Sequence, residues 1–172
     1  QGNYEIDKLN LYGMGGISTI SYTYKDHFSV EKELVEADAI TTFQVKGGGR
    51  YNLDDRLSAF ANVGYVQKPP ILDNVISYDG TVSTDPDNEK FTSFEIGGEY
   101  GSDKVAIKGS YYNTKWNDRN LTKSVTTGQG SSGDTDIIYL TGVNQSHSGV
   151  EVESKIALSE VVDLDIAVSV GD

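Results

Sequence analysis

The residues best suited to chemistry form an acidic run at positions 85–89, which reads Asp-Pro-Asp-Asn-Glu. Carboxylate and amide oxygens at this density are the ligands that calcium prefers in proteins. A calcium loop of the EF-hand type also needs a glycine at its sixth position, and Lys90 occupies that position here. We therefore interpret the run as part of a solvated loop, and we expect no metal site and no cofactor.

No other group of residues indicates catalysis. His27 and His147 are the only histidines, and they lie far apart in the sequence. Cysteine is absent, so disulfides, thiolate nucleophiles and cysteine metal ligands are excluded. The glycine runs at 13–16 and 47–49 lie inside strand-like segments, whereas a phosphate-binding loop needs them at a strand-to-helix turn. We therefore expect that the protein is not an enzyme.

Composition narrows the class of protein further. The 172 residues carry a formal net charge of -12, so no basic surface is available to displace counterions from nucleic acid, and we expect no nucleic-acid partner. No stretch approaches the roughly 20 apolar residues of a membrane-spanning helix. A membrane β-barrel escapes this test, because its strands alternate between polar and apolar residues.

Alternating polarity predicts an all-β chain. About seven segments show the two-residue period of a strand. In one of them, Phe94 and Ile96 alternate with Glu95 and Gly97. The segments run at about 6–25, 40–53, 56–67, 91–100, 104–116, 137–158 and 164–172. The charged residues expected to share a polar face are Glu95, Glu99, Lys108, Glu151, Glu153 and Lys155.

The connections between these segments alternate in length. Short polar turns at 54–55, 102–103 and 159–163 alternate with long links at 26–39, 68–90 and 117–136. An up-and-down meander then has every short turn at one end and every long loop at the other, as outer-membrane barrels do. The first and sixth segments, at about twenty residues, also exceed the usual soluble strand of about 5–6. We therefore predict an antiparallel up-and-down transmembrane β-barrel whose apolar face meets lipid.

Aromatic residues near the strand ends fit this prediction. Rings with a polar tip favour the two interfaces of a membrane, where they form girdles. That tyrosine is simply a good strand former remains an alternative. The group expected at the long-loop end is Tyr22, Tyr24, Phe28, Tyr65, Tyr111, Tyr112 and Trp116, and the group expected at the short-turn end is Tyr51 and Tyr100.

Four motifs follow one another along the chain. Residues 60–75 read FANVGYVQKPPILDNV, residues 88–97 read NEKFTSFEIG, residues 111–119 read YYNTKWNDR and residues 148–153 read SGVEVE. In this order they resemble the barrel of TonB-dependent outer-membrane receptors, particularly those of Bacteroidota. The resemblance covers roughly residues 40–172, and the first segment is compatible with it.

The resemblance implies a large plugged barrel in the bacterial outer membrane. Such receptors import a ferric siderophore, haem, cobalamin or an oligosaccharide, using energy that the TonB complex transmits through an N-terminal plug. The plug and the terminal strands are not recognisable here, and about seven strands would leave sheet edges unpaired in lipid. We therefore expect residues 1–172 to be part of a single barrel domain from a longer polypeptide.

The link at 68–90 is the expected place of ligand contact. Polar and aromatic groups on surface loops suit the capture of a small-molecule chelate or a glycan. Its acidity disfavours an anionic siderophore unless other loops reverse the local field. The candidate residues are Asn74, Tyr78, Asp79, Asp85 and Asp87.

Two other functions remain open at this point. A passive porin or an adhesin-type barrel would share the strands but lack a plug. A soluble, secreted ligand-binding β-barrel would turn the apolar faces inward, and period-two alternation is equally compatible with that arrangement.

Overall fold

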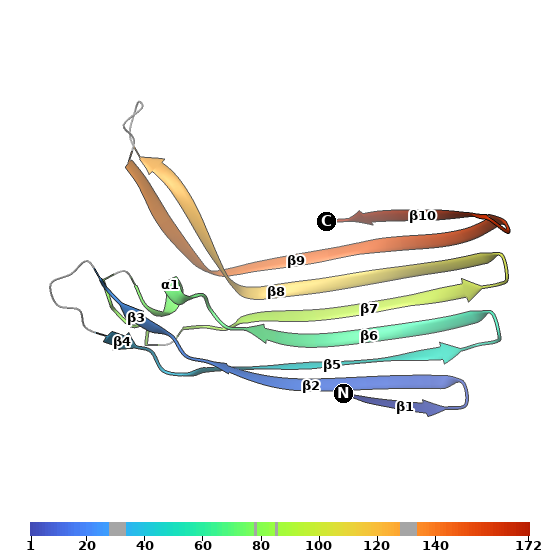
Figure 1. Ribbon diagram of the computed structural model, residues 1–172, viewed down its shortest axis with the longest axis horizontal. Helices are drawn as coiled ribbons and strands as arrows, with labels where there is room; N and C mark the ends of the chain where they lie inside the picture. The colour runs from blue at the N-terminus through green and yellow to red at the C-terminus, as the bar shows by residue number, and fades with distance from the viewer. Residues whose placement is uncertain (28–33, 78, 85, 128–133) are drawn as a thin grey trace.

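The computed structural model describes residues 1–27, 34–77, 79–84, 86–127 and 134–172. Its main element is an eight-stranded antiparallel sheet in which neighbours in space follow chain order. Figure 1 shows these strands side by side, with the short turns at one end and the long connections at the other. The strands are β1 Gly2–Ile6, β2 Leu9–Ile20, β5 Ile40–Asn52, β6 Leu57–Lys68, β7 Glu89–Gly101, β8 Val105–Thr127, β9 Asp134–Ser159 and β10 Val162–Gly171.

Smaller elements lie at the long-connection end. A two-stranded sheet pairs β3 (Thr23–Lys25) with β4 (Leu34–Glu36), and the short helix α1 covers Leu72–Val75. No helix in the described part of the chain is long and apolar enough to cross a bilayer. The antiparallel pairing of the eight strands in chain order confirms the predicted all-β, up-and-down architecture.

The sheet has one strand more than the sequence indicated. Gly2–Ile6 forms β1, which pairs with β2 across a tight turn at Asp7, whose φ is 49°. The alternation at this end is too short to separate two strands from one. The turn lies at the same end as the other short turns (Figure 1), so the predicted alternation of connections is retained.

The expected long link at 117–136 is wrong for most of its length. β8 continues to Thr127 and β9 begins at Asp134, so the two strands extend beyond the sheet as a ribbon that bends away from it (Figure 1). The ladder between them shifts register between Trp116 and Leu121, where Asp118 has a φ of 56°. Because each irregularity offsets the two-residue period, the alternation that marks a strand is hidden there.

The pairing register sorts the side chains into two faces, since residues opposite one another on paired strands share a face. One face carries large hydrophobic residues, and Ile17, Val63 and Val170 are 81%, 62% and 74% exposed. Phe60, Val75 and Ile76 are the buried hydrophobic residues of the described chain. We call this exposed side the apolar face; its members include Leu11, Phe43, Val63, Phe94, Ile107, Val152 and Val168.

The opposite side, which we call the polar face, carries the charged residues. The register places all six residues that the sequence assigned to one polar face on this side. They are joined there by Arg50, Asn62 and Asp165. The polar face therefore includes the charged and polar residues Arg50, Asn62, Glu95, Glu99, Lys108, Glu151, Glu153, Lys155 and Asp165.

The aromatic residues follow the girdle prediction only in part. Tyr65 lies on the apolar face near the long connections, and Tyr51 and Tyr100 lie on it near the short turns. Tyr111 also lies on the apolar face, but it pairs with Ile96 in the middle of the sheet, so its expected position at the long-loop end is wrong. Tyr112 and Trp116 lie on the polar face, so their expected girdle position is wrong. Tyr111 and Tyr112 are consecutive in one strand and must point to opposite sides. Tyr22 and Tyr24 lie outside the eight-stranded sheet, and Phe28 lies outside the described residues.

Three aromatic rings on the polar face lie across a glycine of the neighbouring strand. The register pairs are Tyr12 with Gly48, Phe60 with Gly97, and Tyr112 with Gly149. A Cβ atom on Gly97 would lie 2.5 Å from the Phe60 ring, which is closer than such atoms can approach. These glycines therefore let the rings lie flat on the sheet.

We predict that Gly97→Ala lowers the free energy of unfolding by about 1–3 kcal/mol, because the added methyl group collides with the Gly109 carbonyl oxygen and with the Phe60 ring. Gly101→Ala is the matched control: it lies on the same strand and face, and its Cβ would meet nothing within 4 Å. Urea unfolding of the full-length protein in detergent measures both changes. Equal unfolding midpoints for the two variants would contradict the prediction.

Candidate functional site

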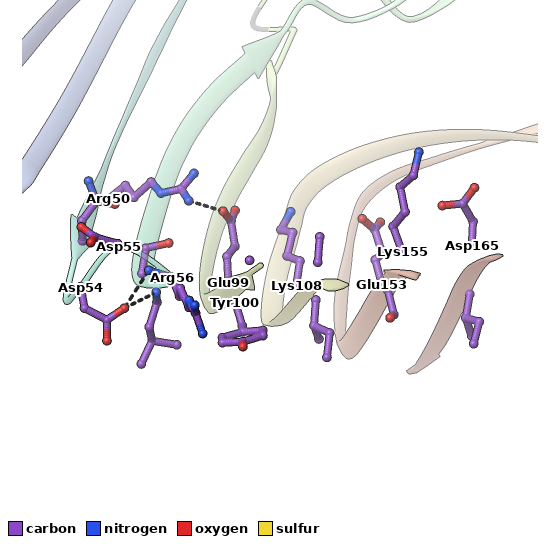
Figure 2. Close-up of a pocket in the computed structure, with 18 of the residues that line it drawn as sticks. Arg50, Asp54, Asp55, Arg56, Glu99, Tyr100, Lys108, Glu153, Lys155 and Asp165 are labelled. Carbon is purple, nitrogen blue, oxygen red and sulfur yellow. Dashed lines mark hydrogen bonds and ion pairs between the residues drawn. The ribbon is translucent and has the colours of Figure 1, made fainter. Parts of the chain in front are cut away.

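A band of opposite charges crosses the polar face near the short turns. Arg50 on β5 forms an ion pair with Glu99 on β7, with 2.7 Å between Nη2 and Oε2. Lys108 on β8 lies 3.7 Å from Glu95 on β7. Figure 2 shows Arg50, Glu99 and Lys108 beside a hollow, which Glu153, Lys155 and Asp165 line at the far side. The mixed signs suit a surface in contact with water or with another polar surface.

A chain of hydrogen bonds runs across the strands in the middle of this face. The Tyr12 hydroxyl donates to Asn62 Oδ1 at 3.0 Å, and Asn62 Nδ2 donates to Glu95 Oε2 at 3.0 Å. Tyr12 lies on β2 and Asn62 on β6, so the ring passes over Gly48 of the intervening strand β5. The missing side chain of Gly48 is what lets this contact form.

The turn between β5 and β6 is fixed by an aspartate. Asp54 Oδ1 accepts hydrogen bonds from the backbone N–H groups of Arg56 at 2.7 Å and Leu57 at 2.9 Å. These two bonds hold the pKa of the Asp54 carboxyl below its usual value. The short turn is thus specified by one local side chain, as is common for aspartate at turns.

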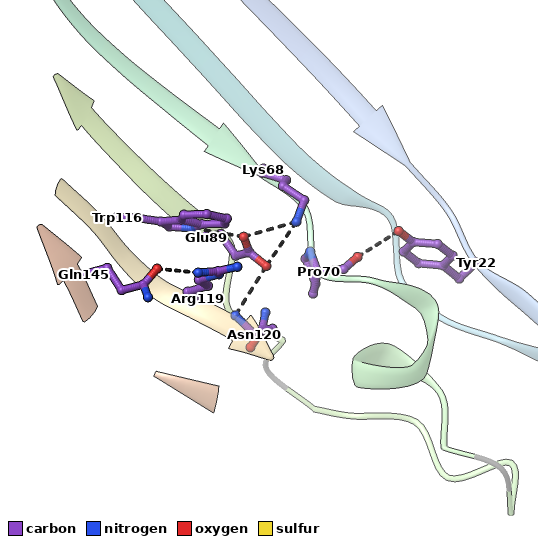
Figure 3. Close-up of polar contacts among 8 residues, drawn as sticks. All are labelled: Tyr22, Lys68, Pro70, Glu89, Trp116, Arg119, Asn120 and Gln145. Atoms are coloured by element: carbon purple, nitrogen blue, oxygen red, sulfur yellow. Dashed lines mark hydrogen bonds and ion pairs between the residues drawn. The ribbon is translucent and has the colours of Figure 1, made fainter. Parts of the chain in front are cut away.

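A buried carboxylate lies at the opposite end of the polar face. Glu89, the first residue of β7, is 1% exposed. Its two oxygens each accept a hydrogen bond from Lys68 Nζ at 3.2 Å; Oε2 also accepts from Trp116 Nε1 at 3.0 Å and Oε1 from the Asn120 backbone N–H at 3.3 Å (Figure 3). Glu89 therefore ties β6 and β8 to its own strand where the long connections begin.

The Trp116 ring extends this cluster into the ribbon. The Arg119 guanidinium stacks on the ring, with its Cζ 3.9 Å from the ring centre, and donates a hydrogen bond to Gln145 of β9. Phe91 packs on the ring with 4.4 Å between centroids. The cluster thus supports the point at which β8 and β9 leave the plane of the sheet.

Glu89 corrects the interpretation of the acidic run at 85–89. The run was expected to be solvated, but Glu89 is buried and belongs to a strand. The available signal was the position of the sequence Asn-Glu-Lys directly before the alternating residues of β7. Sequence alone does not show that Lys68, Trp116 and the Asn120 amide converge on it. Among the described residues, no group of three or more histidine, aspartate or glutamate side chains could hold a metal ion.

The candidate ligand residues are spread over the loop between β6 and β7. Asn74 lies in α1 and is partly buried, whereas Asp79 and Asp87 are exposed. Asp79 Oδ1 accepts the Thr81 N–H at 2.9 Å, and this bond holds the pKa of its carboxyl below the usual value. No hydrogen bond or ion pair joins these three residues to one another. Tyr78 and Asp85 lie outside the described residues.

The loop that carries them is folded on itself. Val75 and Ile76 are 1% and 3% exposed, and Ile76 pairs with Val82 across the turn at Gly80, whose φ is 82°. The loop is also tied to the segment between β2 and β3, because the Tyr22 hydroxyl donates to the carbonyl of the buried Pro70 at 2.8 Å (Figure 3). The exposed carboxylates are thus presented on an ordered base.

We predict that Glu89→Ala lowers the free energy of unfolding by about 2–3 kcal/mol, because the indole N–H and the Lys68 ammonium lose a buried acceptor. Glu99→Ala is the control on the same strand and face. It removes a more exposed ion pair and should cost less than about 1 kcal/mol. Urea unfolding in detergent compares them, and a smaller loss for Glu89→Ala than for Glu99→Ala would refute the prediction.

Comparison with known proteins places this architecture among receptors. A family model described as "TonB dependent receptor-like, beta-barrel" matches residues 1–170. Among solved structures, one titled "Copper transporter OprC" superposes with a TM-score of 0.67 at 20% identity, covering 97% of this chain and 27% of the other. The siderophore receptor PirA from Pseudomonas aeruginosa superposes with a TM-score of 0.62 at 12% identity, covering 95% and 43%. No curated protein sequence matches the chain.

Because the two solved structures are only 20% and 12% identical to this chain, their similarity shows a shared fold alone. The chain spans well under two thirds of either neighbour, at 27% and 43% of their lengths. Its eight strands therefore correspond to a part of each of those barrels.

Proposed function

Because the chain belongs to the TonB-dependent receptor-like β-barrel family, we propose that it forms part of the wall of an outer-membrane transporter that imports a scarce nutrient. Members of this family are bacterial outer-membrane proteins and transporters rather than enzymes, as the sequence resemblance implied. This membership sets aside the alternative of a soluble, secreted barrel.

The separation of the two faces is the observation that carries the proposal. Large hydrophobic side chains are left uncovered on one side of the sheet, and ion pairs cover the other. Lipid solvates the first face, and a water-filled or plugged lumen suits the second. In this arrangement the short turns face the periplasm and the long connections face the cell exterior.

The two edge strands of the sheet indicate that the complete barrel has more strands than this chain. Within the described residues, β1 pairs only with β2 and β10 only with β9. An unpaired edge is not stable in the hydrocarbon region, because lipid offers no hydrogen-bond partners. We infer that further strands pair with both edges, so that residues 1–172 are part of a single closed barrel domain. A plug in its lumen would couple it to the TonB energy-transducing complex.

The cargo classes proposed from the sequence resemblance remain a ferric siderophore, haem, cobalamin or an oligosaccharide. The loop between β6 and β7 is the proposed contact surface, through Asn74, Tyr78, Asp79, Asp85 and Asp87. Its exposed carboxylates favour a neutral or cationic cargo, because an anionic one would be repelled.

We predict that cells expressing the full-length protein accumulate its cargo only while energised, and that an uncoupler abolishes uptake. A passive porin would continue to equilibrate its solute.

Replacing Asn74 and Asp87 together by alanine should weaken cargo binding to de-energised cells by about fivefold, as expected for the loss of one or two surface polar contacts. Asp103→Ala, in a turn at the other end of the sheet, is the control. Uptake that survives the uncoupler would overturn active transport, whereas unchanged binding in the double variant would overturn only the loop assignment.

We predict that Val168→Arg disrupts membrane assembly and that Ala167→Arg does not. The two residues are consecutive in β10, and Val168, 59% exposed, lies on the apolar face, whereas Ala167 lies on the polar face opposite Glu153. An arginine facing lipid costs up to about 2–4 kcal/mol, with the largest cost at the bilayer midplane. Folded protein in the outer-membrane fraction and the urea midpoint measure the effect. Equal behaviour of the two variants would contradict the membrane placement.

A further inference from the structure

The charges on the apolar face are of one sign and lie at one end. Within the regular ladder of the eight strands, before the register shift that follows Trp116, the charged side chains on the apolar face are Lys90 and Lys115. The carboxylates of the same part of the sheet lie on the polar face: Glu5, Glu89, Glu95, Glu99, Glu151, Glu153, Asp163 and Asp165. In a chain with a net charge of -12, this is a local reversal of sign.

The two lysines are close neighbours at the long-connection end. Lys90 is in register with Asn117, and Thr92 is in register with Lys115, so the lysines are diagonal neighbours on β7 and β8 at about 7–8 Å. The Lys90 ammonium is held by Asp118 at 2.8 Å. The Lys115 side chain is exposed and makes no hydrogen bond or ion pair within the described chain. Its ammonium is therefore available to a ligand.

An apolar hollow begins beside Lys115. It is lined by Val45, Val63, Tyr65 and Phe94, with Gly47 leaving space beside Val63. Val45, Val63 and Phe94 are 56%, 62% and 44% exposed, so no part of the described chain covers the hollow. The Tyr65 ring stacks against Phe43 at 5.3 Å, and this contact limits the hollow on the side away from Lys115.

Resting on the proposed function, we propose that this hollow is a binding site for an anionic lipid of the outer leaflet. One acyl chain lies on Val45, Val63 and Phe94, and the lipid phosphate binds the Lys115 ammonium. An ammonium group at the membrane surface attracts anionic headgroups, and the hollow beside it holds the chain that the headgroup carries. Asp118 balances the charge of Lys90, so Lys115 is the cation that the headgroup meets.

The test uses the full-length protein purified in detergent and titrated with diphosphoryl lipid A, with lipid adducts counted by native mass spectrometry. Lys115→Gln should lower the apparent affinity about fivefold, the effect of removing one cation near a headgroup. Lys115→Arg should retain binding, because the charge is kept. Lys46→Gln is the matched control: it removes the same charge from an exposed position on the polar face of β5.

Each outcome decides the proposal. Weaker binding of lipid A by Lys115→Gln, together with unchanged binding by Lys46→Gln, supports a specific lipid site. Equal binding by Lys115→Gln and the parent protein, or equal loss with Lys46→Gln, overturns it. Displacement of the lipid by excess inorganic phosphate would also overturn it, since the site would then recognise a free ion. If Val168→Arg and Ala167→Arg differ as predicted while Lys115→Gln binds normally, the lipid site fails and the membrane placement stands.

Discussion

The rest of this sheet depends on one constraint. Every backbone N–H and C=O group within the membrane must find a hydrogen-bond partner in the protein, because lipid offers none. In the eight-stranded sheet every interior strand is paired on both sides. With that requirement met, the strands need no hydrophobic core. The described chain accordingly buries few hydrophobic side chains and leaves residues such as Ile17 and Val63 exposed on the apolar face. Lipid, not protein, is the cover that this surface fits.

On the polar face, the interactions hold many charged side chains in a fixed arrangement. The Arg50–Glu99 ion pair reaches across β6 from β5 to β7, and rings lie flat on Gly48, Gly97 and Gly149. Exposed pairs of this kind contribute little each to stability. The buried Glu89 differs, because three donors from two other segments converge on its carboxylate. It anchors the base of the loop and of the ribbon, the two elements proposed to face the cell exterior.

The apolar face also carries information beyond its hydrophobicity. Its lysines lie at one end only, and a hollow lies directly beside the unpaired one. Such an arrangement distinguishes the two ends of the sheet chemically as well as by loop length. Because alternate residues of each strand face opposite sides, the same strands present one surface to lipid and the other to polar partners.

Sequence by itself determined the properties that repeat every two residues or stay local. Alternation gave the strands and assigned Glu95, Glu99 and Lys108 to one face, and turn residues such as Asp54 gave the hairpins. Tertiary structure decided whatever depends on long-range register. The burial of Glu89, the polar-face position of Trp116 and the extended ribbon follow from pairing across β6 to β9 and from irregularities that offset the alternation. Asp79 and Asp87 were recognisable as exposed polar residues, but their separation from Asn74 along a folded loop was not. Alternation is a property of one strand, whereas convergence on a single carboxylate needs several strands held in register.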